Sequence, residues 1–162
     1  MAVDEWHGYW VIPSTLFVAM VLAVLPLPVV LQHWRPEWLA LVVLYWAIAL
    51  PHRAGVFTAL IAGLCMDVLE GALLGQNALA LIVITVLALL LYQRIRLFTP
   101  VQQSAVVFIL IGIHQLLCQW LQTLEGAGAR ELTFLLPAFT SAACWLLVLP
   151  LLRGLRRTFQ VT

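Results

Sequence analysis

The side chains best suited to chemistry are one acid and a few polar residues set inside apolar segments. Asp67 interrupts one apolar run, while His114, Gln115 and Gln119 lie in another. An acid within a membrane is energetically costly and by default suggests a functional site. A structural acid, hydrogen-bonded to neighbouring helices, is the alternative, and the sequence leaves both interpretations open.

Asp67 and His114 are expected at similar depth in the membrane. Asp67 lies 12 residues after Gly55 and His114 lies 14 residues after Pro100, so each is about 20 Å along its helix. Depth therefore permits a pair between Asp67 and His114, Gln115 or Gln119. Depth alone does not select it, because a hydrogen-bonded interior histidine fits His114 equally well.

No supported catalytic or metal-binding set occurs in the sequence. It lacks the nucleophile-elbow, zinc-protease, P-loop and dinucleotide-binding motifs, and no second acid in another apolar segment forms a close pair with Asp67. Cys65, Cys118 and Cys144 lie far apart, with no histidine at ligand spacing. We therefore expect neither enzymatic activity, nor a metal, nor a cofactor.

The composition predicts an all-α integral membrane protein. Of the 162 residues, 64% are hydrophobic and 9% are charged, whereas soluble domains have about a quarter charged. No basic stripe indicates nucleic-acid binding. A spanning helix needs about 20 apolar residues. The sequence predicts one transmembrane domain over residues 1–162, with six helices and short loops: 9–30, 36–51, 55–74, 76–92, 100–124 and 133–152.

The arginines predict the orientation of these helices. All eight basic residues are Arg, and six helices place six of them on one side and two, Arg35 and Arg130, on the other. Basic residues favour the cytoplasmic side, which places both termini there. No basic residue precedes the first apolar run, so we expect that helix to remain as an anchor and not to be cleaved as a signal peptide. The six are Arg53, Arg94, Arg96, Arg153, Arg156 and Arg157.

The third predicted helix carries a stripe of small residues at every fourth position. Small residues with this spacing allow another helix to approach closely. Glycine and alanine are also common in membrane helices, but a run this long favours packing. The stripe consists of Gly55, Ala59, Gly63, Asp67, Gly71 and Gly75.

Two motifs resemble the rod-shape-determining MreD family. Arg35-Pro36-Glu37-Trp38, an apolar helix with Tyr45, and Pro51-His52-Arg53 resemble that family's second-helix region. The run from Gly63 through Asp67 and Gly71 to Gly75-Gln76-Asn77 resembles its third-helix signature. The length, helix count and basic C-terminal tail are similar too.

This resemblance implies a multi-pass inner-membrane protein of the bacterial cell-elongation complex, a non-enzymatic subunit that binds MreC and helps to organise peptidoglycan synthesis. The assembly would link MreB filaments to RodA and a class B penicillin-binding transpeptidase. The family is also similar in fold to substrate-binding components of energy-coupling-factor transporters, which makes small-solute binding or transport the alternative. Short loops restrict partner binding to helix faces and loop tips, with Arg35, Pro36, Trp38, Gln76 and Asn77 as candidates.

Overall fold

The computed structural model describes residues 8–126 and 132–161, and these residues are helical with no strand. Three helices are long and apolar enough to cross a membrane: α5, α6 and the stretch from Leu132 to Thr158. Two more, α1 and α3, are apolar but shorter. The helices are α1 (Val11–Val24), α2 (Val29–Gln32), α3 (Trp38–Ala49), α4 (Val56–Glu70), α5 (Gln76–Ile95), α6 (Pro100–Leu124), the 3₁₀ turn η2 (Leu132–Leu135) and α7 (Leu136–Thr158).

The helix predicted over residues 9–30, with Pro26 and Pro28 distorting or ending it, is two helices in the structure. Helix α1 ends at Val24, and the short helix α2 begins only at Val29. The break falls on Pro26 and Pro28, which lack backbone N–H groups and clash with the preceding helical turn. The first helix is therefore shorter than predicted, and a separate turn leads to α3.

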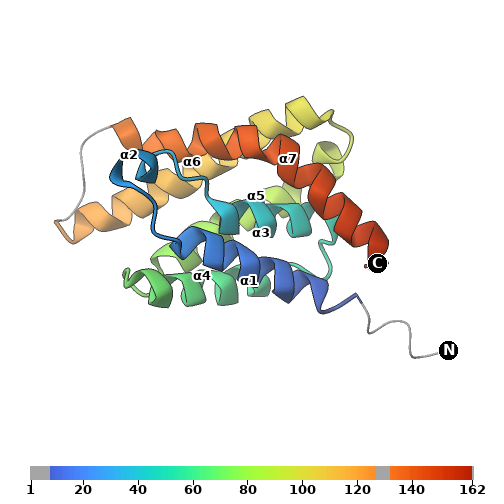
Figure 1. The fold of residues 1–162 in the computed structure, drawn as a ribbon, viewed down its shortest axis with the longest axis horizontal. Coiled ribbons are helices and arrows are strands. Elements are labelled where there is room, and N and C mark those ends of the chain that lie inside the picture. Colours follow the sequence, from blue (N-terminus) through green and yellow to red (C-terminus); the bar gives the residue numbers. More distant parts are fainter. Residues whose placement is uncertain (1–7, 127–131, 162) are drawn as a thin grey trace.

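Helix α3 lies at the centre of the fold. Figure 1 shows α3 and α5 in the middle, with α6 and α7 on one side and α1 and α4 on the other. Every residue of α3 after Trp38 is buried. A helix that is apolar on all sides belongs in an interior, so α3 contacts its neighbours instead of lipid.

The ends of α3 need polar partners from other helices. Its 12 residues span about 18 Å, well short of a hydrocarbon core of about 30 Å. Unpaired backbone groups there are costly. The Arg96 guanidinium donates to the carbonyls of Ile48 and Ala49, and the Glu37 N–H donates to the Ser141 hydroxyl. Side chains of α7 and of the turn after α5 thus cap this helix.

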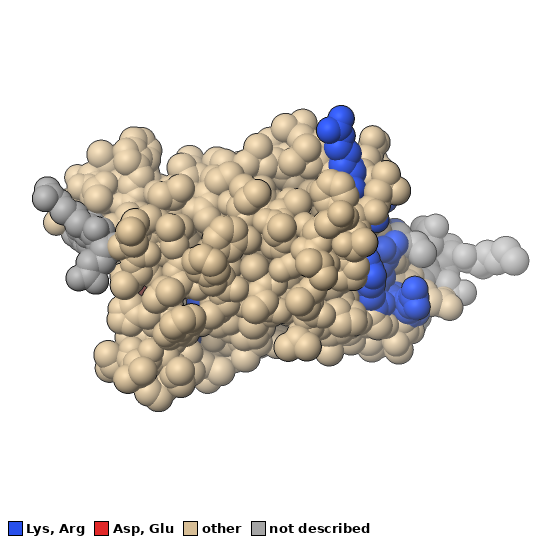
Figure 2. All heavy atoms as spheres, turned by 90° about the horizontal axis from the view of Figure 1, so that it is seen from above, with Lys and Arg blue, Asp and Glu red and all other residues tan. Residues whose placement is uncertain are grey.

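The surface is apolar around its middle and basic at one end. Figure 2 shows arginine side chains gathered toward one end of the face in view, with few charged atoms elsewhere on it. Large apolar side chains such as Phe57, Leu90 and Leu147 are exposed. An apolar surface of this extent marks contact with lipid or with other proteins. Arg130, which the sequence places at the opposite end, lies outside the described residues.

Candidate functional site

Asp67 caps the helix that follows its own. Its Oδ1 accepts a hydrogen bond from the N–H of Asn77 at 2.8 Å, and its Oδ2 accepts from the N–H of Gly75 at 2.8 Å and of Ala78 at 3.4 Å. The first N–H groups of a helix have no partner within it, and the helix dipole favours an anion there. The fully buried carboxylate therefore joins the C-terminal half of α4 to the start of α5.

The predicted pair between Asp67 and His114 does not form. The hydrogen bonds of the Asp67 carboxylate go to backbone N–H groups, and His114 Nδ1 is buried without a hydrogen bond among the described residues. Gln115 donates to the carboxylate of Glu37 instead of Asp67. The N-terminus of α5 supplies backbone donors to Asp67, which depth along the helices could not indicate.

The stripe of small residues divides into two parts with different roles. A Cβ at Gly63 would lie 2.3 Å from Ala78 Cα, so the backbones of α4 and α5 meet there. Ala59, one turn earlier, is fully buried. Gly71 and Gly75 instead have positive φ angles of 64° and 99°, with open space where a Cβ would lie. These two glycines allow the tight connection between the helices, and close packing is confined to the earlier part of the stripe.

Gly55 belongs to neither part of the stripe. It lies at the start of α4 in extended backbone, and a Cβ there would have an ordinary contact of 3.8 Å with the carbonyl of Pro51. The predicted close approach of a helix at this position is absent, because the chain has not yet entered α4.

A small polar cavity, the Glu37–Glu70 cavity, adjoins this cap. It measures about 40 Å³, and its polar lining comes from Arg35, Glu37, Glu70, Asn77 and His114. Asn77 Nδ2 donates to Glu70 Oε2 at 3.0 Å. Such a volume holds about one or two water molecules. The cavity is thus a site for internal hydrogen bonds, too small for a nutrient-sized solute.

Sequence reasoning missed the two acids of this cavity. The sequence indicates Glu37 only as part of a motif and assigns Glu70 no role. A spacing of three residues between Asp67 and Glu70 places both on one face of α4, which was the available signal. Within residues 8–126 and 132–161 no cluster of histidine, cysteine and acidic side chains is arranged to hold a metal.

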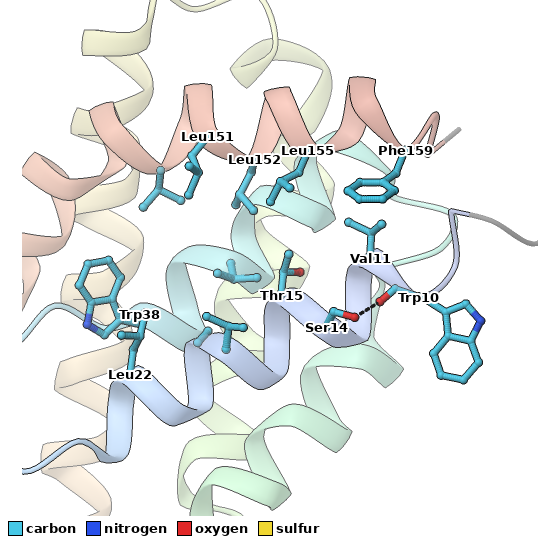
Figure 3. Close-up of a pocket in the computed structure, with 14 residues that line it drawn as sticks. Trp10, Val11, Ser14, Thr15, Leu22, Trp38, Leu151, Leu152, Leu155 and Phe159 are labelled. Carbon is cyan, nitrogen blue, oxygen red and sulfur yellow. Dashed lines mark hydrogen bonds between the residues drawn. The ribbon is translucent and has the colours of Figure 1, made fainter.

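An apolar groove lies between α1 and α7, with α3 as its floor. This α1–α7 groove has a volume of about 450 Å³. Figure 3 shows Trp38 toward one end and Trp10 toward the other, with Leu151, Leu152 and Leu155 along the α7 wall. The α1 wall is Val11, Ser14, Thr15, Val18, Ala19 and Leu22.

The two hydroxyl groups of the groove already have hydrogen-bond partners. Ser14 Oγ donates to the carbonyl of Trp10, and Thr15 Oγ1 donates to Ile12 while accepting from Trp46 Nε1. The groove therefore presents an apolar surface, suited to another helix or to a lipid chain.

The predicted partner-binding residues lie in different environments. Trp38 lines the α1–α7 groove, and Arg35 donates to the carbonyls of Leu22 and Leu25, which fixes the end of α1. Pro36 lines the Glu37–Glu70 cavity. Gln76 and Asn77 are only 6% and 8% exposed. These last two face the interior because they begin α5 against Asp67, so they offer little surface to a partner.

Fold and site together define an all-helical membrane protein in which buried polar side chains hold helix ends together. The chain belongs to the MreD family, since the family model described as rod shape-determining protein MreD matches residues 5–155. The rod shape-determining protein MreD of Haemophilus influenzae is 31% identical over 153 residues, covering 94% of each chain. No solved structure matches, so the similarity to energy-coupling-factor transporter components stays a prediction.

Proposed function

We propose that the protein is a multi-pass, non-enzymatic inner-membrane subunit of the bacterial cell-elongation complex, which binds MreC and helps to organise peptidoglycan synthesis. Membership of a rod shape-determining family supports this function. MreB, RodA and a class B transpeptidase would be reached through the complex. The observation that carries the proposal is the apolar α1–α7 groove.

The groove suits the membrane anchor helix of MreC. Its lining is apolar along α1, whose 14 residues span about 21 Å, or four helical turns. Ala19, Ser14 and Thr15 are small, which lets a helix backbone approach closely. Tryptophans near both ends match the interfacial positions that this residue prefers in membranes.

Arg35 and Asp67 act indirectly in this proposal. Arg35 fixes the end of α1, one wall of the groove, through the Leu22 and Leu25 carbonyls. Asp67 fixes the connection between α4 and α5 and lies outside the groove lining. Arg35→Ala should therefore weaken partner binding more than Asp67→Asn in whatever fraction of each variant is folded.

The test is co-purification of MreC in detergent with variants that fill the groove. Val18 lines the groove and is 55% exposed. Val21 on the same helix is 47% exposed, and it lines neither this groove nor the apolar groove on the other side of α1, against α4. Val18→Trp should reduce MreC recovery severalfold, and Val21→Trp should leave it unchanged.

The other wall offers a second matched pair. Leu151→Trp fills the groove, whereas Leu146→Trp adds the same bulk to an exposed position of α7 outside it. Equal recovery with all four variants would reject the groove as the binding site. Failure of the wild type to retain MreC would reject the partner itself and favour the solute-binding alternative.

A further inference from the structure

A second cavity lies at the basic end of the molecule, between α3, α6, α7 and the turn that follows α5. This arginine cavity has a volume of about 250 Å³. Helix α7 separates it from the α1–α7 groove, because Leu151 and Leu155 line the groove whereas Leu149 and Arg153 line the cavity. Its polar lining is Tyr45, Arg96, Gln103, Trp145, Arg153 and Arg156.

The cavity carries three guanidinium groups and no acid in its lining. Arg96 uses two nitrogens to cap α3, and Arg156 uses Nε to bind the carbonyl of Val161. Among the described residues, no hydrogen bond of normal geometry uses the other N–H groups of these two residues or the guanidinium of Arg153. A guanidinium group can donate two parallel hydrogen bonds to the oxygens of a carboxylate or phosphate. The positive charge of the lining therefore favours an anionic ligand.

Two buried donors in the same lining lack hydrogen bonds. Tyr45 is 3% exposed and Trp145 is 1% exposed, and neither Tyr45 Oη nor Trp145 Nε1 has a partner among the described residues. The Tyr45 hydroxyl lies within electrostatic reach of Arg156, without a hydrogen bond of normal geometry. Buried polar groups are rarely left unpaired. A hydroxyl, an indole N–H and guanidinium groups are all donors, so the complementary ligand is rich in acceptor oxygens.

The position of the cavity indicates which kind of molecule would supply that anion. The cavity lies at the basic end of apolar helices, at the level of lipid headgroups, and basic pockets between helices bind anionic headgroups. We propose that the arginine cavity binds the phosphate group of an anionic phospholipid. Arg153 and Arg156 supply charge, and Tyr45 and Trp145 supply hydrogen bonds. This inference does not depend on MreC binding.

Native mass spectrometry of the full-length protein in detergent tests the proposal, with phosphatidylglycerol as the probe. Arg153→Gln should weaken phosphatidylglycerol binding about tenfold, the effect of one lost charge-assisted hydrogen bond. Tyr45→Phe keeps the ring and removes only the hydroxyl, so it should weaken binding severalfold without lowering the melting temperature.

Arg94→Gln is the matched control, because Arg94 ends α5 but does not line the cavity. It should leave phosphatidylglycerol binding unchanged. If Arg94→Gln and Arg153→Gln weaken lipid binding equally, the proposal is overturned. The lipid would then be held by nonspecific electrostatic attraction to the basic end of the molecule. Unchanged binding in Arg153→Gln and Tyr45→Phe would also overturn it.

Two further probes distinguish the source of the phosphate. Phosphatidylcholine should bind more weakly than phosphatidylglycerol, and inorganic phosphate at the same concentration should not displace the lipid. Equal binding of phosphatidylcholine would overturn the requirement for an anionic headgroup. Displacement by inorganic phosphate would assign the cavity to a soluble anion.

Discussion

Asp67 shows how a membrane acid can be structural. Its two carboxylate oxygens accept three backbone N–H groups at the start of α5. In lipid those N–H groups have no water to replace a missing partner, so each is costly to leave unpaired. The hydrogen bonds of Asp67 thus offset the free-energy cost of burying its carboxylate. They pair backbone N–H groups that a short turn between helices would otherwise leave without partners.

Asp67→Asn should therefore destabilise the protein even if no ligand ever binds there. An amide keeps one acceptor oxygen but places an NH₂ group beside backbone donors, so we expect a loss of about 1–3 kcal/mol. Thermal unfolding in detergent measures it. Glu70→Gln is the control, because glutamine can still accept from Asn77 Nδ2. A melting temperature equally low in both variants would show that charge, and not the capping geometry, matters.

A second prediction concerns the single Cβ atom that a substitution at Gly63 would add. The added Cβ of Gly63→Ala would lie 2.3 Å from Ala78 Cα, and backbone cannot move aside as a side chain can. Separating α4 from α5 should cost about 1–3 kcal/mol. Gly112→Ala, in α6 with nothing within 4 Å of the new Cβ, should be neutral or stabilise by up to about 1 kcal/mol. Similar melting temperatures for the two variants would contradict close packing at Gly63.

At the scale of elements, α3 depends on its neighbours more than any other helix. It is short and buried, and its last carbonyls are bonded by Arg96. From the sequence, the short segment between Pro36 and Pro51 is expected to be thin, tilted or extended past Pro51 with a kink, as a helix in contact with lipid would have to be. Burial inside a bundle removes the need to span the bilayer, and hydropathy cannot distinguish these two environments.

Removing the Arg96 cap should destabilise α3 specifically. Arg96→Leu leaves the carbonyls of Ile48 and Ala49 without their donor, for a loss of about 1–3 kcal/mol. Arg94→Leu removes the same charge two residues earlier and should change stability by less than about 0.5 kcal/mol. The comparison is again thermal unfolding in detergent, and equal losses would mean that the cap contributes nothing beyond charge.

The elements also show which parts of the site the sequence could predict. Spacing located Asp67 and the close approach at Gly63, because both follow from helical periodicity. It could not identify Gly71 and Gly75 as turn residues, since glycine serves packing and positive φ equally well. The α1–α7 groove and the arginine cavity were not predicted, because they depend on how helices from distant parts of the chain are arranged.

For the whole molecule, the distribution of charge carries the prediction of orientation. Arg153 and Arg156 line one cavity with Arg96, and Arg53 stacks on Tyr9, so the start of α1 and the end of α7 share the basic end. Figure 1 shows these two helix ends on the same side of the molecule. The sequence prediction of six spans with both termini in the cytoplasm would place these arginines on the cytoplasmic side.

Fusions to a phosphatase that is active only in the periplasm test this topology. A fusion after residue 162 should give no activity, because six spans return the chain to the cytoplasm. A fusion after Glu125, which follows five spans, should be active. Activity of the full-length fusion would reject the six-span model with both ends inside.

The capping of α3 also has a consequence for the order of synthesis. Glu37 receives its partner from Ser141, 104 residues later, and Ile48 receives its partner from Arg96, 48 residues later. At about 5–20 residues per second, the ribosome needs roughly 5–20 s to make the chain between Glu37 and Ser141. During that interval the central helix has neither its final neighbours nor its final hydrogen bonds. The N-terminal cap of α3 is therefore formed only after α7 has been made, so hydrogen bonding at the centre of the bundle is completed last.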